Sequence, residues 1–229
     1  NYSGKLSMFC WGVLLIIALF GGSVSGAVPG LHIKRAKAIS FNNGYYILTD
    51  GGGYRWDFQY YGNVYSGTNY AYSGGMYCQI NGSNFQAPGN AGWTNKAGDE
   101  IEMGPMSRNG LTISRRIKVY KDQPLARWLE IFENPGSAPV TVQIAMYTCT
   151  NYSIQQTTTS SGGAVFGDKD IGFRVRTQGG NSPPTMHVIT SKRSKIRPTV
   201  QIQSNQIYVR YSLTVPPKKT VILCHFESQ

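Results

Sequence analysis

Aromatic rings interspersed with amide and carboxylate side chains are the clearest chemical pattern in this sequence, and they gather between Tyr45 and Tyr77. Flat rings can stack on sugar rings while Asp, Asn and Gln side chains hydrogen-bond to hydroxyl groups, which is the mixed character of a ligand cleft. The candidates for carbohydrate binding are Tyr65, Tyr70, Tyr72, Trp93 and Asp57. The competing interpretation is core packing, which is favoured most strongly for the alternating aromatic residues Tyr54, Trp56, Phe58 and Tyr60.

Catalytic groups do not form a recognisable constellation in the sequence. Its carboxylates are typical of turns and caps, and a glycosidase pair is defined by separation in space. The histidines His32, His187 and His225 lie in or beside strand-forming runs, without a Gly-x-Ser-x-Gly elbow. Residues 167–170 alternate acids as calcium ligands do, but they lack the rest of a calcium loop, which favours a solvated turn. We expect no catalytic residue, no metal and no cofactor.

Positive charge is in excess, with 22 Lys and Arg against 11 Asp and Glu and a formal net charge of +11. Such a balance favours anionic surroundings. The densest cluster is the segment 192–197 (KRSKIR), but no nucleic-acid-binding module or interleaved aromatic residue accompanies it. We therefore expect no specific nucleic acid as partner. A solvated loop is the simplest interpretation, and contact with anionic polysaccharide or cell-envelope material is the functional alternative.

The N-terminus has the pattern of an export signal. Lys5 precedes the uncharged apolar run Met8–Phe20, and small residues follow up to Ala27. This order predicts a signal peptide over residues 1–27, formed as a helix, and hence a secreted or cell-envelope protein. The alternative is a retained membrane anchor over residues 8–28. The apolar run is shorter than the ~20 residues of a spanning helix, which favours cleavage.

The rest of the chain predicts an all-β fold. The stretch 111–148 contains three strand-forming runs separated by short turn clusters, which predicts an antiparallel meander. Near the C-terminus, alternation over 207–215, two prolines and the run TVILCHF predict a hairpin that pairs Tyr211 with Cys224. That last strand is apolar on both faces and should be central in its sheet. We expect one large antiparallel β-sandwich over residues 31–229.

One residue breaks the alternation. Arg115 falls on the apolar face of its predicted strand, shared with Ile113 and Ile117. If residues 121–124 form the turn, Arg115 stands opposite Glu130 on the next strand. A buried charge is costly unless it is paired, so Arg115 and Glu130 are predicted to form a structural ion pair that sets the register. A slip of two residues would instead place Arg115 over Trp128 as a cation–π contact.

Three cysteines remain after the predicted signal: Cys78, Cys149 and Cys224. An odd number permits one disulfide with a free thiol, or three buried thiols. Cys149 and Cys224 lie in or beside apolar strands, where thiols pack well. We expect stability without a disulfide. No CxxC or Cys/His cluster exists, which disfavours a zinc site.

Three segments, 50–85, 114–142 and 211–229, resemble an uncharacterised β-sandwich module of exported bacterial proteins. The run Ser114–Val142, with Asn134-Pro135-Gly136 at its second turn, also resembles mutarotase-like supersandwich domains, which accompany carbohydrate enzymes. Mutarotases use histidine and glutamate in a sugar cleft, but no histidine here matches such a position. The resemblance implies a supersandwich-like fold without a catalytic residue. We expect a non-catalytic module with a structural or adhesive role; the alternative is a carbohydrate-binding module or an accessory domain of a carbohydrate-active enzyme.

Overall fold

The computed structural model describes residues 30–41, 44–179 and 181–229. The chain divides into two units, residues 1–31 and 32–229, and the described strands all belong to the second. The predicted signal helix over residues 1–27 and the alternative anchor over residues 8–28 lie outside the described residues. Within the part of the chain that is described, no helix is long and apolar enough to cross a membrane.

Short runs of β-branched, aromatic and other apolar residues, separated by glycine-rich turns, build an all-β fold. The described residues form sixteen strands and two 3₁₀ turns. In chain order they are β1 (Lys37–Ser40), β2 (Tyr46–Thr49), β3 (Arg55–Phe58), η1 (Thr68–Tyr70), β4 (Tyr77–Ile80), β5 (Ser83–Asn84), η2 (Pro88–Asn90), β6 (Ala91–Thr94), β7 (Glu100–Arg108), β8 (Leu111–Val119), β9 (Ala126–Glu133), β10 (Val140–Cys149), β11 (Ile154–Thr159), β12 (Gly172–Thr177), β13 (Thr185–Val188), β14 (Thr199–Gln203), β15 (Gln206–Val215) and β16 (Thr220–Ser228).

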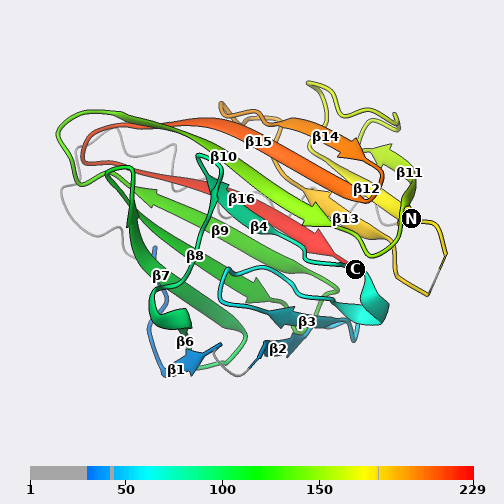
Figure 1. The fold of residues 1–229 in the computed structure, drawn as a ribbon, viewed down its shortest axis with the longest axis horizontal. Helices are drawn as coiled ribbons and strands as arrows, with labels where there is room; N and C mark the ends of the chain where they lie inside the picture. The colour runs from blue at the N-terminus through cyan, green and yellow to red at the C-terminus, as the bar shows by residue number, and fades with distance from the viewer. Residues whose placement is uncertain (1–29, 42–43, 180) are drawn as a thin grey trace. The chain divides into compact units, whose positions relative to one another are not determined.

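The strands form two main antiparallel sheets and one small one. The nine-stranded sheet has the order β1-β6-β7-β8-β9-β16-β13-β12-β11, and the five-stranded sheet has the order β14-β15-β10-β4-β5. Figure 1 shows the five-stranded sheet lying in front of the nine-stranded one. Strands β2 and β3 form the two-stranded sheet. The predicted antiparallel β-sandwich is therefore confirmed.

The core lies between the facing sheets, and alternation decides which side chains enter it. On β10, Val142, Ile144 and Met146 are buried while the residues between them face outward. Tyr211 of β15 meets His225 of β16 edge to face, with 5.9 Å between ring centroids, which joins the two sheets directly. Strand β3 adds to the second layer, since its Trp56 packs against Trp128 of β9 at 5.7 Å.

The predicted meander is right in its first hairpin and wrong in its third strand. Strands β8 and β9 pair antiparallel around the turn at residues 120–125, but β10 pairs with β4 and β15 instead of β9. The connection at 134–139 thus passes from the nine-stranded sheet to the five-stranded one. Pro139 directly precedes β10, and a proline cannot donate a ladder hydrogen bond, which suits a crossing between sheets.

The predicted C-terminal hairpin is also wrong. Strand β15 belongs to the five-stranded sheet, whereas β16 pairs with β9 and β13 in the other sheet. Tyr211 and Cys224 are therefore not paired partners. The prediction that the last strand is central is confirmed, because β16 has a neighbour on each side. The alternation predicts the two strands correctly, but Pro216 and Pro217 lie in a connection between the two sheets instead of a tight hairpin turn.

Asn134 holds both crossings together. Its buried side chain donates to the Ala138 carbonyl at 2.8 Å and to the Val215 carbonyl at 2.9 Å. It also accepts from the Gly136 amide at 2.9 Å, and its own amide donates to the Lys219 carbonyl at 2.9 Å. One amide residue thus satisfies backbone groups of two connections that run side by side.

Cys78 and Cys149 are free thiols, and Cys78 is buried. Cys149 ends β10 in one sheet while Cys224 lies on β16 in the other, and stability without a disulfide stays a prediction. Burial raises the pKa of the Cys78 thiol, which keeps it protonated.

Arg115 stands opposite Glu130, in the register that a turn at residues 121–124 predicts. Both side chains are fully buried on the inner face of the nine-stranded sheet. Nε of Arg115 donates to Oε2 of Glu130 at 2.8 Å, and Nη2 donates to Oε1 at 2.7 Å. Nη1 also donates to the Tyr61 carbonyl at 2.5 Å, and Nη2 to the Met76 carbonyl at 2.9 Å. The charge is thus paired and the guanidinium satisfied.

Replacing Glu130 by Gln should lower the free energy of unfolding by roughly 3–5 kcal/mol, because it leaves the Arg115 charge buried without a counter-charge. The double replacement Arg115→Met with Glu130→Met should recover most of this loss. Urea unfolding monitored by tryptophan fluorescence measures both. Glu133→Gln, on the same strand but only half-buried, is the control and should cost far less. A silent Glu130→Gln would contradict a structural role for the pair.

Candidate functional site

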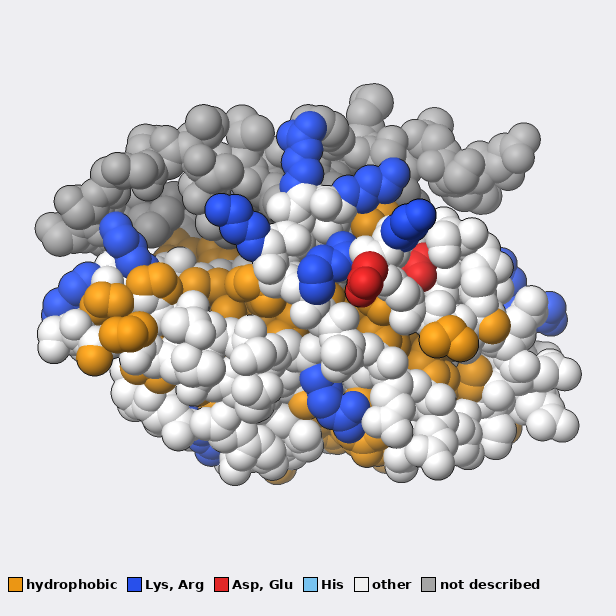
Figure 2. Space-filling model, turned by 90° about the horizontal axis from the view of Figure 1, so that it is seen from above, with side chains coloured by type: hydrophobic (Ala, Val, Ile, Leu, Met, Phe, Trp, Pro, Cys, Tyr) orange, Lys and Arg blue, Asp and Glu red, His pale blue; other side chains and the backbone are white. Residues whose placement is uncertain are grey.

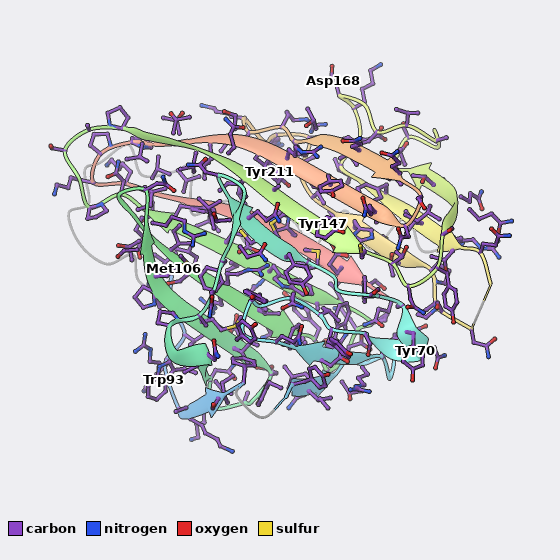
Figure 3. All side chains as sticks on the ribbon, in the orientation of Figure 1. Tyr70, Trp93, Met106, Tyr147, Asp168 and Tyr211 are labelled. Carbon is purple, nitrogen blue, oxygen red and sulfur yellow. The ribbon has the colours of Figure 1, made fainter. Side chains whose placement is uncertain are left out.

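The sequence-predicted sugar-binding residues do not come together. Tyr72 is 1% exposed and Asp57 is fully buried, so neither is available to a ligand. Tyr65 and Tyr70 are exposed at 48% and 66%, and Tyr65 stacks on Tyr45 with 4.6 Å between ring centroids. Trp93 lies on β6 beneath the guanidinium of Arg35. Figure 3 shows Trp93 and Tyr70 well apart.

Asp57 has a structural role. Its carboxylate accepts from the amides of Ser66 and Gly67 at 3.0 and 2.8 Å and from the Ser66 hydroxyl at 2.8 Å. It also lies 3.2 Å from Nη2 of Arg55. These contacts shape the loop between β3 and η1. The competing interpretation of core packing therefore holds for Tyr72, as it does for the strand aromatics Trp56 and Phe58, whereas Asp57 anchors a loop.

A different set of aromatic residues forms a continuous surface. Tyr77 of β4 and Tyr208 of β15 both stand opposite Tyr147 of β10, so the three side chains share one face of the five-stranded sheet. Their neighbours along each strand are buried in the core, so this face points outward. Tyr60 and Tyr61 extend the line from the loop after β3. We call these five residues the tyrosine row.

The rings of the tyrosine row are in unbroken contact. Successive ring centroids are 4.1 Å apart for Tyr60 and Tyr61, 5.7 Å for Tyr61 and Tyr77, 6.3 Å for Tyr77 and Tyr147, and 4.8 Å for Tyr147 and Tyr208. The rings are tilted against one another by 32–53°. All five side chains are half-exposed. The row thus presents both apolar ring surface and hydroxyl groups to solvent.

The buried ion pair positions one end of the row. The carbonyl of Tyr61 accepts from Arg115, and the next carbonyl, that of Gly62, accepts from Nε1 of Trp128 at 3.1 Å. Gly62 has φ +69°, and a Cβ there would lie 2.8 Å from Met103 and 3.0 Å from Arg115. No other residue fits this position without displacement. Hydrogen bonds from the buried side chains of Arg115 and Trp128 therefore hold the loop that carries Tyr60 and Tyr61.

Tyr77 is positioned by the same guanidinium. The preceding residue, Met76, has a left-handed backbone with φ 61°, which is uncommon outside glycine. Its carbonyl accepts from Arg115 at 2.9 Å and its amide donates to Oγ1 of Thr148 at 2.9 Å. These two bonds hold the start of β4 against β10, which aligns Tyr77 with Tyr147.

Polar side chains flank the row on the same face. The neighbouring position of each strand carries Gln79, Ala145 and Arg210, which lie in register across β4, β10 and β15. The guanidinium of Arg210 lies over the Tyr208 ring at 4.5 Å and donates to Gln201 at 3.0 Å. Among the described outward-facing residues on the strands of the five-stranded sheet, Arg210 is the one charged side chain. The small side chain of Ala145 lies between two longer side chains that can form hydrogen bonds, those of Gln79 and Arg210.

Three tyrosines of the row, Tyr61, Tyr77 and Tyr147, have a pKa above the ordinary value. A hydrogen bond with Tyr60 raises the pKa of Tyr61, and burial raises the pKa of Tyr77. Burial and the contact with Cys149, whose Sγ lies 2.6 Å from the hydroxyl, raise the pKa of Tyr147. A neutral aromatic surface with hydroxyl, amide and guanidinium groups can stack on sugar rings and hydrogen-bond to their hydroxyls.

The tyrosine row was not predicted from the sequence, although part of its pattern is visible there. In each of the three strands one tyrosine occupies the polar half of the alternation, beside Gln79 on β4, Ala145 on β10 and Arg210 on β15. The sequence alone does not show that these three tyrosines stand opposite one another across the strands. That alignment depends on the pairing of β4 with β10 and of β10 with β15, strands distant in sequence.

A second polar constellation lies inside the sandwich. Oγ1 of Thr185 is 3.0 Å from Nε2 of His187, whose Nδ1 is 2.6 Å from Oε2 of Glu227. This is the order of a nucleophile, a base and an acid. The three residues are at most 2% exposed, so no substrate reaches the threonine hydroxyl in this conformation. Burial raises the pKa of Glu227, although His187 opposes the shift.

His225 is buried on the same inner face. Neither ring nitrogen has a hydrogen-bond partner in the described part of the chain. Burial, together with the charge of Arg115, lowers the pKa of His225 from 6.5 to about 3. The ring is therefore neutral under ordinary conditions. Within the described residues, no group of three or more His, Cys, Asp or Glu side chains could hold a metal ion.

The burial of His225 predicts a loss of stability in acid. The unfolded chain binds a proton at His225 below about pH 6.5, whereas the folded protein resists protonation down to about pH 3. Its contribution is thus present above pH 6.5 and is lost as the pH falls through this window. Between pH 7 and pH 4.5 the loss should be roughly 2–3 kcal/mol. Urea unfolding at both pH values, compared with His225→Phe, isolates it. Equal losses in the two proteins would contradict the assignment.

Comparison with known proteins found no match in sequence. No protein-family model matches the chain, and no curated protein matches it.

Proposed function

We propose that this protein is an exported, non-catalytic module that binds glycans through the tyrosine row, with an adhesive role. The observation that supports the proposal is the unbroken contact of five half-exposed tyrosine rings, three on strands of one sheet and two on the loop after β3. An extended row of rings suits a chain of sugar units better than a single small molecule, because successive units can stack along it. Export remains the expectation from residues 1–27.

The flanking groups support a sugar ligand over an apolar one. Gln79, Gln201 and Arg210 offer amide and guanidinium groups beside the rings. The strand positions further along β10 and β15 are Thr141 opposite Thr214 and Gln143 opposite Ser212, which are also polar. A surface that inserts into lipid would carry a more apolar face here. The mixed aromatic and hydrogen-bonding face fits hydroxyl-rich ligands.

A second candidate function, an acid–base enzyme, is favoured only by the Thr185, His187 and Glu227 constellation. Its burial between the sheets argues for a structural part instead, because buried polar groups in mutual contact also specify a core. We therefore propose that these residues fix the packing of β13 against β16. The carbohydrate-enzyme accessory domain suggested by the resemblance is compatible with glycan binding by the tyrosine row.

The double substitution Tyr147→Ala with Tyr208→Ala should weaken binding to the glycans that wild-type protein selects on a polysaccharide array by at least about tenfold, or 1.4 kcal/mol. Stacking surface is lost at the end of the row formed by β10 and β15. Phenylalanine at both positions should retain most of the affinity, since the rings remain.

Tyr70→Ala is the matched control, because Tyr70 is exposed but outside the row. Circular dichroism and thermal melting establish that each variant folds. Glycan binding that survives both alanine substitutions in a folded protein, or that Tyr70→Ala removes, would reject the tyrosine row as the binding surface.

A further inference from the structure

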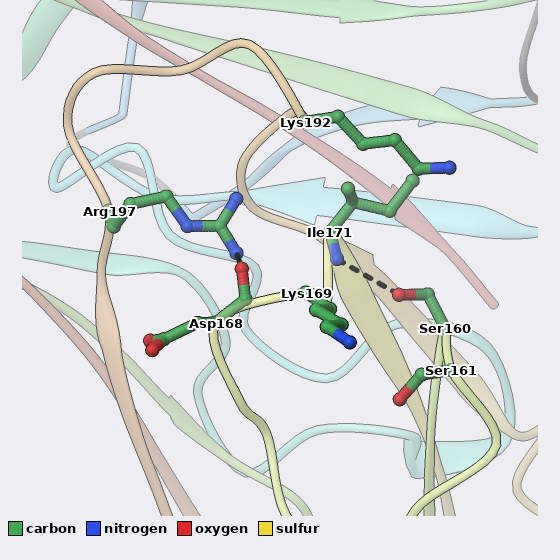
Figure 4. A pocket seen from close by; sticks show the side chains of 7 residues that line it. All are labelled: Ser160, Ser161, Asp168, Lys169, Ile171, Lys192 and Arg197. Atoms are coloured by element: carbon green, nitrogen blue, oxygen red, sulfur yellow. Dashed lines mark hydrogen bonds between the residues drawn. The ribbon is translucent and has the colours of Figure 1, made fainter.

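An open depression of about 620 Å³ lies between two loops, residues 160–171 and 191–197. Its lining residues, drawn in Figure 4, are Ser160, Ser161, Asp168, Lys169, Ile171, Lys192 and Arg197. The second loop leads directly into β14, which is the edge strand beside β15. We call this depression the basic pocket.

The tyrosine row runs toward the basic pocket. It crosses β4, β10 and β15 in that order, and the next strand in the sheet is β14. Gln201 of β14 stands opposite Tyr208 and bonds to Arg210, so the polar surface continues onto the edge strand. Figure 3 places Tyr147 in the middle of this sheet and Asp168 beyond β14. A chain bound along the row would therefore leave the sheet at the edge that carries the pocket.

The charge of the basic pocket is positive. The two loops contain five cations (Lys169, Lys192, Arg193, Lys195 and Arg197) against two carboxylates (Asp168 and Asp170). No carboxylate of the described residues lies within ion-pair distance of the exposed Lys169 or Lys192. Figure 4 shows the Asp168 carboxylate turned away from both ammonium groups. Figure 2 shows blue side chains gathered on this face around a small acidic area.

The scaffold under the two lysines is built from satisfied groups. Arg197 donates to the carbonyls of Ser191, Asp168 and Asp170 at 3.0, 2.5 and 2.6 Å, which ties the two loops together. The buried carboxylate of Asp170 accepts from the amides of Gly167 and Ser161 at 2.9 and 2.8 Å. Burial alone would raise the pKa of Asp170, but these hydrogen bonds lower it, so the carboxylate is ionised and occupied.

The charged groups of the basic pocket have two different roles. Arg197 and Asp170 hold the loops, while Lys169 and Lys192 present their charges to solvent without a counter-charge. Two such ammonium groups beside a hydroxyl-lined depression match an oxyanion, which accepts several hydrogen bonds at once. Arg210, the one charge beside the tyrosine row, has the same sign.

We infer that the basic pocket is a subsite for an acidic substituent, a carboxylate or a sulfate, of a glycan bound along the tyrosine row. The inference rests on the proposed function, and it specifies the substrate class as an anionic polysaccharide. Lys169 and Lys192 contact the acidic group, and the row stacks on the sugar rings. An anionic lipid surface is the competing partner, but a depression at the edge of a sheet whose outer face is polar and aromatic fits a chain better than a bilayer.

The test compares acidic and neutral forms of the same polymer. The probes are polygalacturonate against its methyl ester for the carboxylate, and dextran sulfate against dextran for the sulfate, measured by affinity electrophoresis and titration calorimetry. Lys169→Ala with Lys192→Ala should weaken binding of the preferred acidic polymer by at least about tenfold at low salt and leave the neutral form unchanged. Lys37→Ala with Lys96→Ala, two exposed lysines outside the pocket, is the charge-matched control and should have little effect.

The outcomes separate this inference from the proposed function. Equal wild-type affinity for acidic and neutral polymers, or equal losses in the two lysine variants, overturns the subsite and leaves the tyrosine row intact. If the pocket variant loses the acidic polymer but Tyr147→Ala with Tyr208→Ala loses nothing, the pocket binds anions alone and the glycan platform is rejected. Binding to phosphatidylglycerol vesicles in preference to every polymer, lost in the pocket variant, assigns a membrane surface instead and overturns the inference.

Discussion

The ion pair between Arg115 and Glu130 is the interaction on which the rest of this structure depends. Both charges lie between the sheets, where an unpaired charge would be very costly. The arrangement is favourable because each nitrogen of the guanidinium donates a hydrogen bond, to one carboxylate and two backbone carbonyls. The four hydrogen bonds of Arg115 reach three segments. Two go to Glu130 on β9, one goes to the loop after β3, and one goes to the residue before β4. The pair therefore sets the β8–β9 register and also fixes the two segments that deliver Tyr61 and Tyr77 to the surface.

The two faces of the five-stranded sheet divide the protein's tasks. Inward, β10 and β15 contribute aliphatic residues and Tyr211, whose hydroxyl donates to the Ile189 carbonyl at 2.6 Å. Outward, the same strands carry threonine, glutamine, serine and tyrosine. Because a strand alternates strictly, the tyrosine row is a direct consequence of the register that buries Met146 and Ile207. A slip of one residue would bury Tyr147 and Tyr208 and expose the core, so the packing of the interior also secures the platform.

The interior contains several buried polar and charged side chains, which lie on the neighbouring strands β8, β9, β16 and β13. Arg115 pairs with Glu130, His225 stays neutral, and Glu227 contacts His187. Such groups add little net stability, but they penalise wrong packing, because any other register would leave a charge without its partner. This selectivity matters where β9 and β16 must pair although each is joined in sequence to a strand of the opposite sheet.

The sequence by itself determined the strands, the all-β class, the pairing of Arg115 with Glu130 across a four-residue turn, and the central place of the last strand. Each of these depends on residues close together or on alternation within one run. The partners of β10 and β15 were decided only by the tertiary structure, because a turn containing prolines can equally close a hairpin or cross between sheets. The tyrosine row was hidden for the same reason. Tyr77, Tyr147 and Tyr208 are separated by 60 to 70 residues in the chain, and only the pairing of β4, β10 and β15 brings their rings into contact. Asp57 and Tyr72 failed as candidates because polar and aromatic residues serve loop anchoring and core packing as readily as ligand binding, and burial alone distinguishes these uses.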